Sequence, residues 1–343
     1  MNRLSGVCFL LCFQAASCIL NHVGIAEAQT SSPTDDKTPS LAEWRSTKVE
    51  HAYGLPDTKA NQKGVLTINA AGFIFTGNSG SYTIPRPALL AVSTGNERVE
   101  LWGMKGRILR MAIPDGGGIA AAGVMHHKVN MLSVEFKDSR DGYHAAVFYL
   151  PEGEGEQVIS GFAKLRPGQH GISKLDPARS APTCENSSID PRSVLITMPD
   201  WNQTEVPAAY RAFLYEHAVD RVQRLQGIGH VYREGEGFGQ KMCPEYTIHV
   251  SVSAFRQGSQ VERAVMGPVG MFVGTTQMSF QVNITDTTEQ LNVSDQLKAT
   301  VRGESESKNV ADSVAKTIAK RYAAETRKFE KTRVASAGQA IRE

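Results

Sequence analysis

Short runs of β-branched and aromatic residues, separated by glycine-containing turns, dominate the chain between residues 64 and 150. Runs of this kind, bounded by turn residues, predict strands. We expect strands over 65–69, 73–75, 82–85, 99–102 and 108–113, then a hairpin that pairs 131–137 with 143–150. Residues 152–165 follow with apolar positions at helical spacing. This half of the chain is therefore predicted to be a strand meander that ends in one helix.

Longer amphipathic segments alternate with strands after residue 192. We expect strands over 194–198, 230–232, 246–255, 278–284 and 297–301, and a helix over 204–226 with Pro207 in its first turn. A final helix is predicted to begin near Ser305, because an apolar stripe recurs at helical spacing through Val310, Val314, Ile318 and Tyr322. The predicted fold class is α+β.

The first 28 residues are organised like a secretory signal peptide. Arg3 provides a positive start, residues 4–20 are mainly apolar, and Ala26-Glu27-Ala28 forms the small-x-small pattern that signal peptidases cut. Cys18 follows Ala15-Ala16-Ser17 and offers a second processing site, where a bacterial lipoprotein would be acylated. We favour cleavage after Ala28, which predicts a periplasmic or secreted protein. Processing at Cys18 would instead give a membrane-anchored lipoprotein.

Two segments rich in proline and polar residues divide the chain. They predict a signal peptide over 1–28, a disordered linker over 29–63, a β domain over 64–166, a second linker over 167–192, an α+β domain over 193–331 and a tail over 332–343. The length of 343 residues suits two domains. A net charge of +2 is too balanced for a dedicated nucleic-acid-binding protein, so we expect no nucleic-acid partner.

The cysteines agree with export. Cys8, Cys12 and Cys18 lie in the leader, so the mature chain keeps only Cys184 and Cys243. Two cysteines in an oxidising compartment predict one disulfide bond. Two separate thiols are the alternative, because the sequence does not fix their geometry.

The block 64–165 resembles the pleckstrin-homology-like (PH/GRAM-type) domains. The resemblance rests on Gly64-Val65-Leu66-Thr67-Ile68, Gly72-Phe73-Ile74-Phe75, Tyr82-Thr83-Ile84-Pro85 and the late hairpin followed by a helix. It implies a β-barrel with a C-terminal helix. The first hairpin carries Asn69-Ala70-Ala71-Gly72 where phosphoinositide-binding members place Lys and Arg. The resemblance therefore implies a docking or scaffolding barrel without a phosphate site.

The block 194–324 resembles the bacterial envelope domain of unknown function 4410, which is similar in shape to curli-secretion-type and lipoprotein domains. The carriers are residues 255–259 and 263–270, the strand 277–285 and the terminal helix. Gly267-Pro268-Val269-Gly270 departs from the Gly-Phe-Gly turn of that family. The resemblance implies a small α+β sheet domain with two long helices and a location in the envelope.

No motif in the sequence assembles a catalytic, cofactor or metal site. His126 and His127 are adjacent and would point to opposite faces of a strand, and His217 lacks the His-Glu-x-x-His zinc signature. Residues 235–241 are rich in glycine but lack the spacing of a phosphate-binding loop. We therefore predict no enzyme activity, no cofactor and no metal.

Two segments are candidates for contacts with partners. Residues 265–273 form either a buried loop or an exposed apolar lip whose contact residues would be Met266, Met271, Phe272 and Val273. Basic residues accumulate between Lys316 and Arg333, where they form either a solvated helix face or a peripheral contact with membrane headgroups. We favour the solvated face.

These features predict a non-enzymatic, exported envelope protein that acts as an interaction or scaffolding module for envelope protein partners. An envelope hydrolase with dispersed active-site residues is the alternative, and a pocket that gathers His126, His144 or His217 with carboxylates would favour it. A carrier of an apolar ligand is a further alternative, which would require an apolar cavity.

Overall fold

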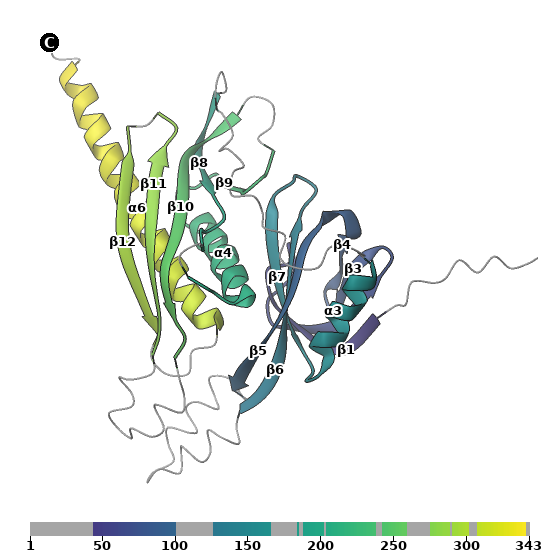
Figure 1. The fold of residues 1–343 in the computed structure, drawn as a ribbon. Coiled ribbons are helices and arrows are strands. Elements are labelled where there is room, and N and C mark those ends of the chain that lie inside the picture. Colours follow the sequence, from purple (N-terminus) through teal and green to yellow (C-terminus); the bar gives the residue numbers. More distant parts are fainter. Residues whose placement is uncertain are drawn as a thin grey trace, which may run out of the picture. The chain divides into compact units, whose positions relative to one another are not determined.

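A computed structural model describes residues 44–100, 126–165, 184, 188–201, 204–237, 242–258, 275–288, 290–301 and 307–340. The described part is α+β, with a seven-stranded antiparallel sheet, a five-stranded mixed sheet and three α-helices (Figure 1). The predicted fold class is confirmed at this level. The leader, Cys18 and the apolar lip with Met266, Met271, Phe272 and Val273 lie outside the described residues.

The first sheet has the strand order β4-β3-β2-β1-β7-β6-β5. Its strands are β1 (Trp44–Tyr53), β2 (Gln62–Asn69), β3 (Gly72–Gly77), β4 (Gly80–Pro85), β5 (Leu89–Glu100), β6 (His126–Lys137) and β7 (Tyr143–Leu150). A short 3-10 helix, η1 (Arg86–Ala88), joins β4 to β5, and helix α3 (Glu154–Leu165) follows β7. The predicted hairpin is confirmed, since Lys137 pairs with Tyr143 at its turn.

One face of this sheet encloses a compact apolar core. Phe75 of β3 and Phe148 of β7 lie with their rings 5.6 Å apart, and Tyr82 of β4 lies 6.2 Å from the ring of Phe136 on β6. Strands distant in the sheet order thus share one core, so the sheet must curl, as twisted sheets do. Among the described strands no pairing joins the edges β4 and β5, so this part is an open, curled sheet and not a closed barrel.

The predicted linker over 29–63 is partly wrong, because β1 lies within it and occupies the centre of the first sheet. The sequence pattern did not predict β1 because some of its buried side chains are polar. Ser46 and His51 are buried on it alongside Val49 and Ala52, so its inward positions do not form an apolar alternation. The second predicted linker also ends earlier than expected, since β8 already begins at Ser188.

The second sheet has the order β12-β11-β10-β8-β9. It comprises β8 (Ser188–Ile196), β9 (His230–Arg233), β10 (Met242–Arg256), β11 (Thr276–Asp286) and β12 (Asn292–Val301), with helices α4 (Ala208–Gln223) and α6 (Ser307–Ala340). Strand β8 pairs in parallel with both β9 and β10, and the other pairs are antiparallel. Pro207 is the N-cap residue of α4, so it precedes the first turn in which it was predicted to lie. Helix α6 continues into the predicted tail.

Helix α4 packs against both sheets. Its side chains share one apolar cluster with Ile248 and Phe280 of the second sheet and with Ala145 and Val147 of the first. Tyr215 of α4 meets Tyr143 of β7 edge to face at 5.0 Å. This shared helix brings polar residues from both sheets into one place.

The predicted disulfide is confirmed. Cys184 and Cys243 are bonded, with their Cα atoms 5.9 Å apart. The bond fastens the chain ahead of β8 to β10, and it closes a loop with a sequence separation of 59 residues.

Candidate functional site

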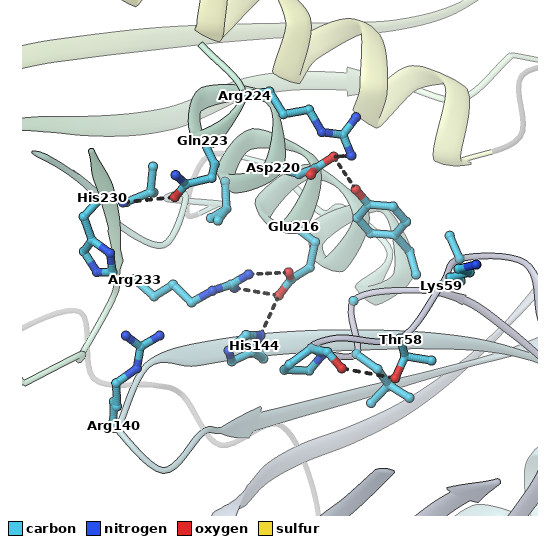
Figure 2. Close-up of a pocket in the computed structure, with 17 residues that line it drawn as sticks. Thr58, Lys59, Arg140, His144, Glu216, Asp220, Gln223, Arg224, His230 and Arg233 are labelled. Carbon is cyan, nitrogen blue, oxygen red and sulfur yellow. Dashed lines mark hydrogen bonds and ion pairs between the residues drawn. The ribbon is translucent and has the colours of Figure 1, made fainter. Parts of the chain in front are cut away.

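A cavity of about 500 Å³ lies beside the contact between α4 and the first sheet (Figure 2). Its walls come from the loop between β1 and β2, the turn between β6 and β7, helix α4 and strand β9. Helix α4 contributes Glu216, Val219, Asp220 and Gln223, and its C-cap residue Arg224 follows on the same face. Most of the lining residues are charged or polar, and apolar side chains such as Leu55, Val219 and Val231 complete the wall.

A buried ion pair holds the inner part of this pocket. Arg233 of β9 donates from Nη2 to Glu216 Oε2 at 2.9 Å and from Nη1 to Glu216 Oε1 at 3.0 Å. Glu216 also accepts from the backbone N–H of Ala145, and Arg233 donates to the backbone oxygen of Tyr143. Burial lowers the pKa of Arg233, but the charge and hydrogen bonds of Glu216 outweigh burial and raise it overall. The guanidinium therefore stays charged and fixes α4 to β7.

His144 of β7 lies between two carboxylates. Its Nε2 is 3.3 Å from Asp138 Oδ2, and its Nδ1 is 3.7 Å from Glu216 Oε1. The ring stacks on Phe136 at 5.3 Å. Burial lowers the pKa of His144 and outweighs the opposing effect of Glu216 and Asp138, so the ring is neutral at pH 7. Both ring nitrogens are thus directed at protein carboxylates, and Nδ1 has no hydrogen-bond partner among the described residues.

A turn motif organises the carboxylate of Asp138. It accepts from the backbone N–H groups of Arg140 and Gly142 at 2.8 and 2.9 Å, besides facing His144. Burial raises the pKa of Asp138, yet these hydrogen bonds and His144 lower it overall. The ionised form of Asp138 therefore stabilises the turn between β6 and β7.

The outer part of the pocket consists of more exposed ion pairs. Tyr53 donates to Asp220 Oδ2 at 2.7 Å, and Asp220 also pairs with Arg224 at 2.8 Å. Arg140 pairs with the buried carboxylate of Glu236 at 3.1 Å. Burial, followed by the Asp220 hydrogen bond and charge, raises the pKa of Tyr53, so its hydroxyl remains a donor. Lys59 extends the wall from the loop between β1 and β2 (Figure 2).

The buried side chain of His51, in β1, holds the loop between β1 and β2 through two hydrogen bonds. The backbone N–H of Leu55 donates to His51 Nε2 at 3.1 Å, so Nδ1 carries the proton and donates to the Lys59 backbone oxygen. Burial lowers the pKa of His51 and favours this neutral form. Gly54 has a φ of +94°, and a Cβ there would lie 2.2 Å from the backbone oxygen of Ala145. Only glycine fits this approach of the loop to β7.

Backbone hydrogen bonds join the two sheets next to the pocket. Tyr143 N–H donates to the Glu234 oxygen at 2.9 Å, and Gly237 N–H donates to the Arg140 oxygen at 3.0 Å. The turns that follow β6 and β9 therefore support each other. The pocket lies where these two turns contact α4.

The sequence-based candidates have separate locations. His144 belongs to the pocket, whereas His217 packs against Tyr53 with ring centroids 4.2 Å apart and has Nδ1 3.9 Å from Asp312. His126 lies at the start of β6, and its side chain is outside the described part. Within the described residues, no group of three His, Cys, Asp or Glu side chains is placed to hold a metal ion. Gly235 forms the turn after β9 with a φ of +76°.

The main pocket residues were not among the candidates predicted from the sequence. These are Asp138, Arg140, Glu216 and Arg233. One local signal points to Glu216, which directly follows the apolar and aromatic run from Ala212 to Tyr215 inside a predicted helix. A charge next to such a run needs a buried partner, but the sequence does not say that Arg233 supplies it.

None of the helices in the described part is both long and apolar enough to cross a membrane. No family model matches the chain, and no curated protein matches it, so both family resemblances remain predictions. Similar solved structures are two crystal forms of the PelC dodecamer from Paraburkholderia phytofirmans, one of which carries a single leucine-to-methionine substitution. Each is 16% identical over 38% of this chain, covering 86% and 89% of the solved chains with TM-scores of 0.27 and 0.26. Similarity at this level assigns neither a family nor an activity.

Proposed function

We propose that the protein is an exported, non-catalytic binding module of the cell envelope, and that the pocket beside α4 receives part of a protein partner. One observation carries this proposal: the charged groups of the inner pocket are bonded to one another. Glu216 is used by Arg233 and Ala145, and both nitrogens of His144 face carboxylates. Such a pocket presents a preorganised polar surface without offering a free nucleophile and base.

The disulfide supports the proposed location. A bond between Cys184 and Cys243 persists in an oxidising compartment, and the apolar leader with its Ala26-Glu27-Ala28 exit provides a route to one. We assign the mature chain to the periplasm or the extracellular space, with the Cys18-anchored lipoprotein as the alternative.

The finer PH-like assignment also belongs to this proposal. A curled antiparallel sheet with α3 packed beside the core of β2 and β6 is compatible with such a domain. In this arrangement the first sheet supplies the docking scaffold, and the loop between β1 and β2 forms one wall of the partner site.

Site-specific photocrosslinking in the intact envelope tests the proposal. A photoreactive residue in place of Lys59, at the pocket wall, should give a discrete adduct with one envelope protein. The same residue in place of Lys320, which is exposed on α6, serves as the matched control. An adduct from position 59 alone supports the proposal. Absence of an adduct, or equal adducts from both positions, counts against it.

An envelope hydrolase is the second candidate, because the pocket does gather His144 with Asp138 and Glu216. In such an enzyme His144 would accept a proton at Nδ1 after a movement that exposes it. Purified protein would be assayed on ester, phosphoester, glycoside and peptide substrates. Turnover that is lost in His144→Gln and retained in His217→Gln would favour this candidate over the binding module.

A further inference from the structure

Positive charge is concentrated on helix α6. The helix contains eight Lys or Arg residues and three Asp or Glu residues, whereas the net charge of the whole chain is only +2. The rest of the chain is therefore net negative. Solvated surfaces normally mix charges of both signs, so α6 differs both from the remainder of this protein and from an ordinary solvated helix.

The exposed cations of α6 include a straight row along one face. We call this set the basic row; it consists of Lys316, Lys320, Arg327 and Lys331. Successive members are separated by four, seven and four residues, all close to whole helical turns. All four side chains are exposed, and Ile318 and Tyr322, which are buried in the core, lie on the opposite face of the helix. At 1.5 Å per residue the row is about 22 Å long.

The charges of the basic row are not neutralised within the described part of the protein. None of its members forms an ion pair with a described residue, whereas Arg321, on another face of the helix, is bonded to Asp295 and Glu325. Asp312 lies one turn before the row, but it is bonded to Arg221 of α4. The acids nearest to α6 are thus used by other cations.

Neither local pairing nor the helix dipole accounts for the row. Lys316 and Lys320 are four residues apart, as are Arg327 and Lys331, and like charges at this spacing weaken a helix. Glu330, which is exposed and three residues from Arg327, is a single acid beside four cations. Cations are stabilised by the dipole only in the last turn of a helix, and the last turn of α6 contains no basic residue. The row therefore has no stabilising role within the described fold.

An exposed apolar side chain extends the row at the free end of the helix. The C-terminal part of α6 continues past the ends of β11 and β12 (Figure 1). Phe329 is the last described residue of α6 that packs against the core, and residues 330–336 are exposed. Val334 follows Lys331 on the same face and is 71% exposed. One face of this helix end thus presents cations and then an apolar group.

We propose that the basic row binds the surface of a membrane that contains anionic phospholipids. A bilayer surface is flat and carries many phosphate groups, so it can contact a straight row of cations along its whole length. Lysine presents a compact charge on an apolar stem, which suits the headgroup region, and Val334 would lie at the boundary with the acyl chains. A linear acidic polymer is held better by a groove or by aromatic stacking, whereas the row lies on a convex helix and has no aromatic member.

Flotation with lipid vesicles tests the proposal. The mature chain is used, because the apolar leader would itself bind lipid. We expect the protein to float with vesicles that contain phosphatidylglycerol and to remain unbound with vesicles of phosphatidylcholine alone. Binding should disappear in about 1 M salt, where the screening length is only about 3 Å.

Variants identify the surface that binds. Each neutralised cation of the row should weaken partitioning about five-fold, since a cation near an anionic membrane contributes about 1 kcal/mol. The row is neutralised in Lys316→Gln/Lys320→Gln/Arg327→Gln/Lys331→Gln, which should no longer float. The matched control removes four exposed cations outside α6 and should bind like the wild type: Arg45→Gln/Lys48→Gln/Lys63→Gln/Lys298→Gln.

The outcomes separate the alternatives. The proposal is overturned if the mature chain does not bind anionic vesicles, or if the row variant floats as well as the wild type. Equal loss in the row variant and the control would assign binding to net charge and would also overturn it. Retention on immobilised alginate or DNA without flotation would assign the row to an acidic polymer instead. Melting temperatures check the fold: glutamine is a good helix former and removes the like charges, so the row variant should melt no lower than the wild type.

Discussion

Glu216 and Arg233 form a buried bidentate ion pair that connects α4 to β9, and Glu216 also holds the backbone N–H of Ala145 in β7. Helix α4 and one strand of each sheet thus meet at one carboxylate. Breaking a buried pair leaves an unpaired charge, which costs far more than the pair contributes. We expect Glu216→Gln to lower the free energy of unfolding by about 3–5 kcal/mol.

Urea denaturation at pH 7.5 measures this change. The matched control is Arg224→Met, which removes the exposed pair with Asp220 and should cost at most about 1 kcal/mol. Equal losses in the two variants would contradict the structural role assigned to Glu216.

Acidification should destabilise the protein through buried neutral histidines. Burial lowers the pKa of His217 to about 4, although Asp312 opposes it, and burial lowers those of His51 and His144 as well. The unfolded chain then binds more protons than the folded chain between pH 6.5 and pH 4. The contribution of these histidines to the free energy of unfolding is therefore complete above pH 6.5 and decreases as the pH falls. His217 alone accounts for roughly 3 kcal/mol across this range.

Urea midpoints at pH 7.5, 5.5 and 4.5 give the measurement. His217→Phe removes the titrating group and keeps the ring that packs on Tyr53 and Phe213, so its pH dependence should be flatter. A wild-type stability that does not change over this range would contradict the assignment of neutral buried histidines.

The disulfide should contribute strongly to stability. Closing a loop with a sequence separation of 59 residues lowers the entropy of the unfolded chain by an amount worth about 4 kcal/mol. We expect Cys184→Ala/Cys243→Ala to lower the melting temperature markedly. Reductant should lower that of the wild type to a similar value and leave the double variant unchanged. A double variant that melts like the oxidised wild type would refute this prediction.

Gly54 should tolerate no side chain. Gly54→Ala combines a positive φ with a Cβ only 2.2 Å from the Ala145 oxygen, so it should cost more than about 3 kcal/mol. Gly153 has a φ of +84°, and a Cβ there would meet nothing within 4 Å, so Gly153→Ala isolates the conformational cost of about 1 kcal/mol. Thermal unfolding of both variants separates the two effects, and equal costs would show that the close approach is unimportant.

The sequence predicted those elements whose burial alternates along the chain. The hairpin of β6 and β7 follows from local alternation and a polar turn, and the stripe from Val310 to Tyr322 identifies α6. Strand β1 was not predicted because its buried Ser46 and His51 break the apolar alternation. The ring nitrogens of His51 form hydrogen bonds with backbone groups, and no local sequence pattern shows this. The predicted helix over 204–226 was too long at its start, since the chain before Pro207 is not helical.

The pocket was less predictable than the fold for a related reason. Glu216, Asp220 and Arg224 are four residues apart, and this spacing, which places them on one helix face, can be read from the sequence. Their partners Tyr53, Ala145 and Arg233 come from other elements, and the Tyr53–Asp220 bond spans a sequence separation of 167 residues. Pairing at that distance depends on how the two sheets meet, and this information is not local.

The central position of β1 has a consequence for folding. The strand pairs with β2 on one side, but on the other its Glu50 must find Tyr149 of β7, almost at the end of the first sheet. The meander β2-β3-β4 can form from local contacts. The pairing of β1 with β7, which joins the two halves of the sheet, requires a segment that is distant in the sequence, and this slows folding. During synthesis from the N-terminus, β1 therefore exposes an unpaired edge until β7 has emerged, and in that interval the edge is open to pairing with other chains.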